Sequence, residues 1–204
     1  MNRKKRKAYG TVILVIINVV IFFYLTFLGM TEDAEFMLEH GAMYVPYILK
    51  NGEYYRLFTS MFMHFGFEHL VNNMVMLLLI GRTLEPEIGR IRFLIIYFLS
   101  GFCGNICSAL WDMSTQEFAV SAGASGAVFG IVGAILYVAL CNRGHIGDIS
   151  GRGLVFMTAL SLYLGFTGGG VDNFAHIGGL VSGFVLAVLL YWKRKSKYRR
   201  NAGR

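Results

Sequence analysis

The sequence is poor in charged residues, proline and cysteine. Of its 204 residues only 15% are charged and 55% are hydrophobic, with a mean hydropathy of +0.55. This composition excludes an ordinary soluble domain, in which about 25% of the residues are charged. The three cysteines do not suit a disulfide framework, because Cys103 and Cys107 lie within one apolar run and Cys141 ends another. We interpret them as packing residues.

The sequence also lacks linkers, low-complexity tracts, internal repeats and the HExxH motif of zinc proteases. We therefore expect one domain over residues 11–192, between basic cytoplasmic tails at 1–10 and 193–204. The segment "HFGFEH" at 64–69 looks like a metal-binding motif, but it is too long for HxxEH. An intramembrane metalloprotease stays a rival hypothesis, which chelator sensitivity would favour. No metal or cofactor is expected.

Six apolar runs make up most of the sequence: 11–29, 68–81, 93–111, 126–141, 153–167 and 174–192. Several approach the roughly 20 residues that a helix needs to cross roughly 30 Å of hydrocarbon. Lipid offers the backbone no hydrogen-bond partners, so each run is predicted to be a helix. The first run is longer than the roughly 7–15 apolar residues of a signal peptide, which indicates a retained helix. The predicted fold class is all-α, a polytopic membrane protein with a six-transmembrane-helix bundle.

The net charge of +7 is placed unevenly along this pattern. All but two of the 19 Lys and Arg residues fall in the two tails and in the turns at 82–92 and 142–152. Cytoplasmic segments of membrane proteins are rich in Lys and Arg, so both termini are predicted to be cytoplasmic. We interpret the basic tails as contacts with the lipid bilayer and not with nucleic acid. A short tail without a soluble domain suggests a prokaryotic plasma membrane.

The longest connection, residues 30–66, lies on the opposite side of the membrane and is rich in Tyr, Phe and Met. Aromatic residues often anchor a protein at the membrane interface. Two interpretations stay open. The connection is either a belt of aromatic anchors or a structured flap that shapes a site inside the membrane.

Glycine is abundant, with 25 residues. Gly126, Gly130 and Gly133 share one helical face, as do Gly179 and Gly183. In lipid, helices gain little by hiding apolar surface from one another, and small residues instead allow their backbones to pack closely. The fourth and sixth apolar helices are therefore predicted to pack against each other through these glycines.

Polar residues are rare inside the six runs, where an ionisable side chain costs about 2.5–3.5 kcal/mol at the bilayer centre. Asn105 is interpreted as a hydrogen-bonding link between helices. With both termini cytoplasmic, the second, fourth and sixth helices run in the same direction. His69, Ser125 and His176 then all lie near the outer ends of their helices. Polar residues from three helices at one depth indicate a functional site.

Ser125 follows the small residues of "SAGASG" at the start of the fourth helix. Its neighbours Gly123 and Gly126 let a substrate carbonyl approach, and the free N–H groups of a helix start suit a developing oxyanion. A lone GxSG stretch is a weak signal, because serine is also a common helix cap. His176 supplies the partner, since the glycine pairing brings it to the same depth as a candidate general base.

His69 and Asn73 lie one helical turn apart and therefore share a face of the second helix. An imidazole N–H and an amide NH2 on that face can both donate hydrogen bonds to an oxyanion. The predicted chemistry is acyl transfer, with Ser125 and His176 as the catalytic pair and His69 and Asn73 as stabilising donors.

These residues resemble the motifs of the rhomboid intramembrane serine proteases. "GASG" is similar to the GxSG motif of that family, "HLVNN" to its HxxxN segment and "AHIGGLVSG" to its AHxxGxxxG motif. The resemblance extends over residues 11–192. Phe129 stands where family members often carry an aromatic residue that stacks on the catalytic histidine, whereas Tyr55 replaces the tryptophan of the family's Trp-Arg pair. His64 and Glu85 match positions that the family tends to keep polar, and we interpret both as structural.

The resemblance implies a Ser125–His176 dyad without a third acid, which hydrolyses peptide bonds in or beside the transmembrane segments of other proteins. It implies a rhomboid-like helix bundle, membrane protein substrates as partners and a site towards the extracytoplasmic side. Substrate helices are expected to enter from lipid past the helix at 153–167, which the glycines at 168–170 leave free to move. The alternative is a non-catalytic rhomboid-like protein that binds membrane helices, or a small transporter.

Overall fold

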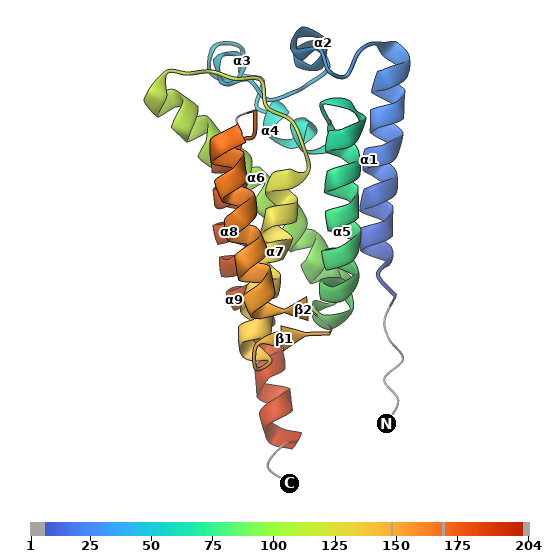
Figure 1. Cartoon of the computed structure of the whole chain (residues 1–204), viewed down its shortest axis with the longest axis vertical. Helices are drawn as coiled ribbons and strands as arrows, with labels where there is room; N and C mark the ends of the chain where they lie inside the picture. The colour runs from blue at the N-terminus through green and yellow to red at the C-terminus, as the bar shows by residue number, and fades with distance from the viewer. Residues whose placement is uncertain (1–6, 148, 169, 202–204) are drawn as a thin grey trace.

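The described part of the chain is built mainly from helices (Figure 1). This computed structural model describes residues 7–147, 149–168 and 170–201, of which 192–201 are described by their backbone alone. The helices are α1 (Tyr9–Leu28), α2 (Ala34–Glu39), α3 (Val45–Asn51), α4 (Arg56–Thr59), the 3-10 helix η1 (Ser60–Phe62), α5 (Gly66–Ile88), α6 (Arg90–Thr115), α7 (Ser125–Cys141), α8 (Gly151–Gly168) and α9 (Asn173–Asn201). Two short antiparallel strands, β1 (His145–Ile146) and β2 (Ile149–Ser150), join α7 to α8. The all-α fold class is confirmed, and the hairpin is an addition that the apolar pattern does not predict.

A long helix lies at each of the six apolar runs. Three helices are long and apolar enough to cross a membrane: α1, α6 and the part of α9 up to Tyr191. α5 also meets this criterion when it is taken together with the α4–η1 segment, from which it bends by 88°. Among the described residues, α7, with 17 residues, and α8 do not meet this criterion alone. The chain is a multi-pass integral membrane protein, while crossing by all six helices stays a prediction. α9 continues as a helix to Asn201, beyond the domain boundary predicted at 192.

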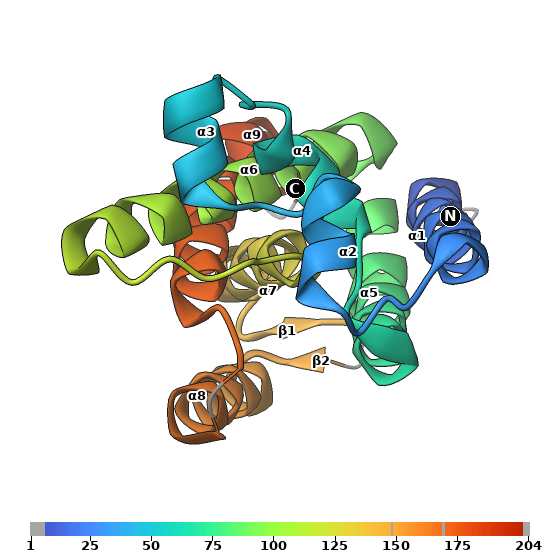
Figure 2. The ribbon, with the colours of Figure 1, turned by 90° about the horizontal axis from the view of Figure 1, so that it is seen from above.

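α7 lies at the centre of the bundle, with α5, α6, α8 and α9 around it and α1 outside α5 (Figure 2). Its sequence is apolar on every face, as expected of a helix enclosed by others. α7 and α9 meet backbone to backbone. A Cβ atom built on Gly179 would overlap the carbonyl oxygen of Gly126, and one built on Gly183 would overlap that of Gly130. This close approach holds the start of α9 against the start of α7.

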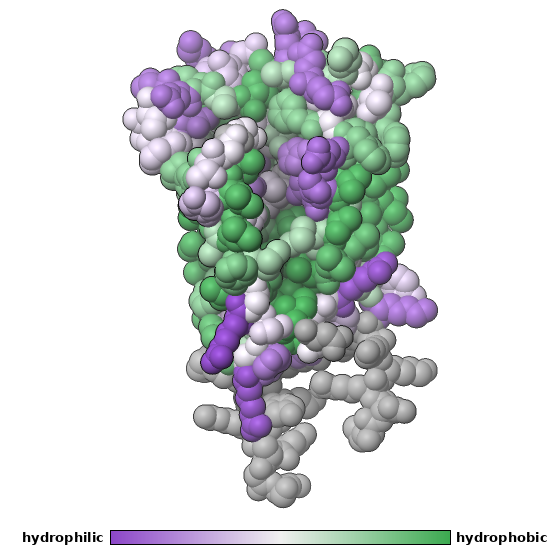
Figure 3. All heavy atoms as spheres, viewed as in Figure 1, coloured by the Kyte–Doolittle hydropathy of each residue, from purple (hydrophilic) through white to green (hydrophobic). Residues whose placement is uncertain are grey.

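The outer surface carries a hydrophobic band between two more polar ends (Figure 3). Exposed side chains such as Phe27 of α1 and Phe156 of α8 belong to this apolar surface. α8 contributes little to the core, because most of its side chains face outward and its buried residues are Leu154, Thr158 and Gly165. Figure 3 shows the surface hollowed between α8 and α5. α8 is therefore the least enclosed of the helices around α7.

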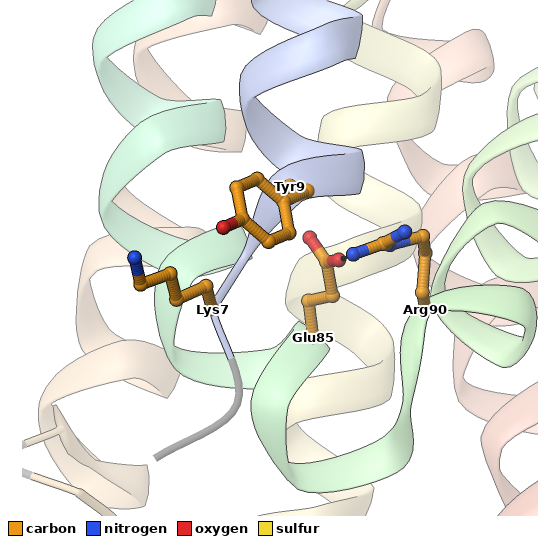
Figure 4. A pocket seen from close by; sticks show the side chains of 4 residues that line it. All are labelled: Lys7, Tyr9, Glu85 and Arg90. Carbon is orange, nitrogen blue, oxygen red and sulfur yellow. Dashed lines mark hydrogen bonds and ion pairs between the residues drawn. The ribbon is translucent and has the colours of Figure 1, made fainter. Parts of the chain in front are cut away.

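Glu85 caps the start of α1 at the end of the bundle where both described termini lie (Figures 1 and 4). The N–H groups of Gly10 and Thr11 donate to its two carboxylate oxygens at 2.9 and 2.7 Å, and the Thr11 hydroxyl donates at 2.9 Å. Arg90 pairs with the carboxylate at 3.4 Å. The first N–H groups of a helix have no acceptor within the helix, so a buried carboxylate satisfies them. Glu85 has the structural role interpreted from the sequence.

The connection between α1 and α5 folds over the other end of the bundle as α2, α3, α4 and η1 (Figure 1). Arg56, which is 3% exposed, holds it together: Nη1 donates to the carbonyl oxygens of Leu38 (2.6 Å) and Ala42 (2.9 Å), and Nε donates to Glu53 (2.6 Å). Hydrogen bonds from the Asn51 amide and the Arg56 guanidinium lower the pKa of the Glu53 carboxyl, which keeps this pair charged. These bonds favour the structured flap over a plain belt of anchors.

Asn105 of α6 fastens this connection to the bundle. Its Nδ2 donates to the carbonyl oxygen of Leu57 at 2.8 Å and to Oγ of Ser60 at 3.0 Å. Both partners lie in the α4–η1 segment, so the interpretation of Asn105 as a link between helices is confirmed. The amide satisfies backbone and hydroxyl groups of a short helical segment that is buried against α6.

Candidate active site

The segment before Ser125 is held by two backbone hydrogen bonds. The Gly123 N–H donates to the carbonyl oxygen of Ser60 at 2.9 Å, and the Ala124 N–H donates to Nε2 of His64 at 3.4 Å. Gly123 has a φ of +146°, which residues with a side chain rarely adopt. α7 begins at Ser125, so the N–H groups of its first turn have no acceptor within the helix. This arrangement presents the half-buried Ser125 hydroxyl beside free backbone donors.

His176 lies near the start of α9 and faces α7. Its ring stacks on that of Phe129, with 4.2 Å between centroids and 9° between planes. Phe129 follows Ser125 by one helical turn, so both side chains lie on the same face of α7. Gly126 also lies close to α9, because a Cβ atom built on it would lie 3.4 Å from the carbonyl oxygen of Ala175. The neighbours of Ser125 on α7 thus pack against His176 and the residue before it.

The orientation of the His176 ring comes from this stacking. The side chain is 7% exposed, and its Nδ1 is buried without a hydrogen-bond partner among the described residues. No carboxylate of the described chain therefore holds the ring at Nδ1.

His69 reaches the same place from α5. A Cβ atom built on Gly123 would lie 2.9 Å from Cε1 and 3.0 Å from Nε2 of His69, and 3.5 Å from Oγ of Ser125. The imidazole and the hydroxyl therefore flank one point of the backbone. The fully buried His64 ring meets the His69 ring edge-on, with 5.2 Å between centroids. His64 supports both His69 and the Ala124 amide, which fits a structural role.

Asn73 lies one turn beyond His69 on α5 and is 7% exposed. Its Nδ2 donates to the carbonyl oxygen of His69 at 3.0 Å. This hydrogen bond is local to α5, and the amide carries a second N–H that can donate to a ligand. The structure thus brings His69, Ser125 and His176 to one end of the bundle, with Asn73 a turn deeper.

Asp172, directly before α9, also belongs to this end of the bundle. Its carboxylate accepts hydrogen bonds from the Ala175 N–H (2.9 Å) and from the hydroxyls of Ser108 (2.6 Å) and Ser121 (2.7 Å). Sequence reasoning treats Asp172 only as a loop charge, although an acidic residue before a helix is a common cap. The two serine partners have no sequence signal, because they are 64 and 51 positions away.

A comparison with known families decides the identity of this bundle. The family model of the Rhomboid domain matches residues 51–193, which is most of the chain. The chain belongs to the rhomboid family. The matched region includes α5 to α7 and with them His69, Ser125 and Phe129, as well as the start of α9 with His176.

Three curated relatives show the extent of the likeness. The rhomboid protease GluP of Bacillus subtilis is 36% identical over 180 residues, which cover 88% of this chain and 34% of GluP. RHOMBOID-like protein 4 of Arabidopsis thaliana is 41% identical over 152 residues (74% of this chain, 37% of that protein). YdcA of Bacillus subtilis is 34% identical over 148 residues (72% of this chain, 73% of YdcA). This rhomboid spans between 34% and 50% of the length of the first curated relatives that it matches.

Proposed function

We propose that this rhomboid is an intramembrane serine endopeptidase that cleaves peptide bonds in or near the transmembrane segments of other membrane proteins. Ser125 is the nucleophile and His176 is the general base. The observation that carries the proposal is the stacking of His176 on Phe129, one turn from Ser125, within a helix pair held together by glycine contacts. The likeness to the rhomboid protease GluP over most of this chain supports the same activity.

The proposed reaction has two halves. In the first, Oγ of Ser125 attacks the carbonyl carbon of the scissile peptide and its proton passes to His176. Nε2 of His176 is the nitrogen that can accept this proton, because Nδ1 is buried. The C–N bond breaks and the imidazolium returns the proton to the leaving amine. In the second half, water attacks the acyl-enzyme, His176 takes a proton from the water, and that proton returns to Oγ of Ser125.

The carbonyl oxygen becomes negatively charged in both halves and needs hydrogen-bond donors. The N–H groups in the first turn of α7 are available, because a helix start leaves them without acceptors. The His69 ring beside Gly123 and the second N–H of Asn73 are the side-chain donors that we assign to this oxyanion. Backbone and side-chain donors from two helices would then stabilise the same charge.

We propose that substrate helices reach the site from the lipid between α5 and α8. α8 buries few side chains, and the surface is hollowed between α8 and α5 (Figure 3). Little apolar packing therefore opposes an outward movement of α8. The sequence predicts a hinge at residues 168–170, of which residue 169 lies outside the described residues.

The proposed orientation follows from the ends of the bundle. His69, Ser125 and His176 lie near the first residues of α5, α7 and α9, at the end away from the two described termini (Figure 1). With both basic tails in the cytoplasm of a prokaryotic cell, the site opens on the extracytoplasmic side of the plasma membrane. Residues 11–192 then form the membrane domain between two cytoplasmic tails.

The test is cleavage of a panel of single-span membrane proteins by the full chain in detergent micelles. The wild type should release two fragments and should be labelled covalently by a fluorophosphonate. Ser125→Ala and His176→Ala should lose cleavage, and Ser125→Ala should also lose labelling, while both elute from size-exclusion chromatography like the wild type. Cleavage at the normal rate by Ser125→Ala would rule out this function. Retention of substrates by a wild type that neither cleaves nor labels would favour the alternative of a non-catalytic helix-binding protein.

A further inference from the structure

The carboxylate of Asp172 joins three separate segments at the outer end of the bundle. Oδ1 accepts from the Ala175 N–H in the first turn of α9 at 2.9 Å. Oδ2 accepts from Ser108 of α6 at 2.6 Å and from Ser121, in the segment between α6 and α7, at 2.7 Å. One side chain thus ties α6, the segment before α7 and the start of α9 together.

Ser121 and Asp172, the two partners of this hydrogen bond, each precede one residue of the proposed dyad by the same number of positions. Ser125 lies four residues after Ser121, and His176 lies four residues after Asp172. The hydrogen bond is thus a second link between the segment that precedes the nucleophile and the segment that precedes the base. The glycine contacts between α7 and α9 are the first link and lie on the other side of the dyad, deeper in the bundle.

Ser121 is itself held firmly. Its N–H donates to the carbonyl oxygen of Met43 at 2.9 Å, and its carbonyl oxygen accepts from the Met43 N–H at 2.8 Å. Two residues later, the Gly123 N–H donates to Ser60. The segment before α7 is therefore attached to the outer connection on one side and to Asp172 on the other, so a loss of the Asp172 bond frees one side only.

We propose that Asp172 is a positioning residue of the dyad, which sets the distance between Ser125 and His176 through its hydrogen bond with Ser121. The inference rests on the proposed function. Asp172 bonds to Ser108, Ser121 and Ala175 and not to the reacting atoms. It acts through α9 and through the segment before α7, by hydrogen bonds that an uncharged amide can also form.

The choice of variants separates hydrogen bonding from charge. Asp172→Ala removes every bond of the carboxylate. Asp172→Asn keeps an oxygen for the Ala175 N–H and offers an NH2 to the serine hydroxyls, which can accept as well as donate. Ser121→Ala removes only the hydrogen bond between the segment before α7 and Asp172. Ser182→Ala is the matched control, because its hydroxyl donates only within α9, to the carbonyl oxygens of Gly178 at 2.6 Å and Gly179 at 3.0 Å, and has no bond to Asp172 or Ser121.

The experiment measures kcat and KM on a single-span substrate, the rate of fluorophosphonate labelling of Ser125 and the midpoint of thermal unfolding, all on the full chain. A catalytic group displaced by about 1 Å loses about 10²-fold in rate. We therefore expect Asp172→Ala to lower kcat and the labelling rate of folded protein by up to about 10²-fold. Ser121→Ala should lower both rates in the same direction but less. Asp172→Asn and Ser182→Ala should stay close to the wild type, and KM should stay unchanged throughout.

Several outcomes would overturn the inference. Wild-type labelling and kcat in folded Ser121→Ala would show that the link does not position the dyad, and this variant remains informative if Asp172→Ala fails to fold. An Asp172→Asn variant as impaired as Asp172→Ala would show that the charge matters instead of the bond. If the wild type itself shows no cleavage or labelling that depends on Ser125, the proposed function fails. If the wild type is active and the variants match it, only the role of Asp172 fails.

Discussion

Replacement of Gly179 by alanine tests whether the contact between α7 and α9 sets the geometry of the site. A Cβ atom at this position would overlap the carbonyl oxygen of Gly126 and lie 2.8 Å from its carbonyl carbon. Since non-bonded carbon atoms in contact lie about 3.5–4.0 Å apart, α9 has to move away from α7 by about 1 Å. His176 moves with α9, whereas Ser125 stays with α7. Such a displacement is expected to lower kcat about 10²-fold, or about 2.7 kcal/mol in activation free energy.

The assay is cleavage of a single-span substrate in detergent, with kcat divided by the folded fraction from size-exclusion chromatography. The same change also costs stability, typically about 1–3 kcal/mol for an overpacked core, so thermal unfolding is measured in parallel. Gly153→Ala of α8 is the matched control, because its methyl group would meet Ser150 at an ordinary 3.9 Å. It should cleave like the wild type. A folded Gly179→Ala variant with the wild-type kcat would show that this contact does not set the geometry of the site.

Further predictions address the oxyanion, the cap of α1 and the entry of substrate. Asn73→Ala should lower kcat about 10²–10³-fold with an unchanged unfolding midpoint, and unchanged kinetics would remove Asn73 from the oxyanion site. Glu85→Gln should destabilise the protein by about 1–3 kcal/mol, because backbone donors of α1 lose a charged acceptor, yet kcat of the folded fraction should stay normal. A disulfide between cysteines introduced at the outer ends of α5 and α8 should suppress cleavage of a membrane substrate and release it on reduction. Equal cleavage in both redox states would exclude entry between these helices.

The sequence predicts the helical bundle because lipid leaves the backbone few choices. An apolar run that contacts hydrocarbon has to satisfy its own N–H and C=O groups, so each of the six runs is a helix. The glycine spacing predicts which helices meet, since residues without a side chain mark where backbones approach. Gly126 and Gly179 are in contact in the structure for that reason. The location of His69, Ser125 and His176 at one end of the bundle follows from the direction of their helices.

The partners of polar side chains were decided only by the tertiary structure. Asn105 is predicted from the sequence to link helices, but only the structure shows that its partners lie in the α4–η1 segment of the outer connection. The sequence predicts only a charged loop residue at Asp172, whereas the structure places Ser108 and Ser121 within hydrogen-bond distance of it. A hydrogen bond needs donor and acceptor within about 3 Å, and residues so far apart in sequence meet only after the helices have packed.

The sequence predicts the chemical groups of the candidate site, but it does not predict how closely they are arranged. The residue types alone predicted a serine, a histidine and candidate oxyanion donors near one depth of a helical membrane protein. The packing of α9 on α7 decided that the His176 ring lies flat on Phe129, with its Nδ1 buried. Apolar patterns report only which faces avoid water, and in lipid they do not distinguish a neighbouring helix from a lipid chain. Which helices other than α9 surround α7, and how closely they approach it, therefore depended on the three-dimensional contacts of small and polar residues.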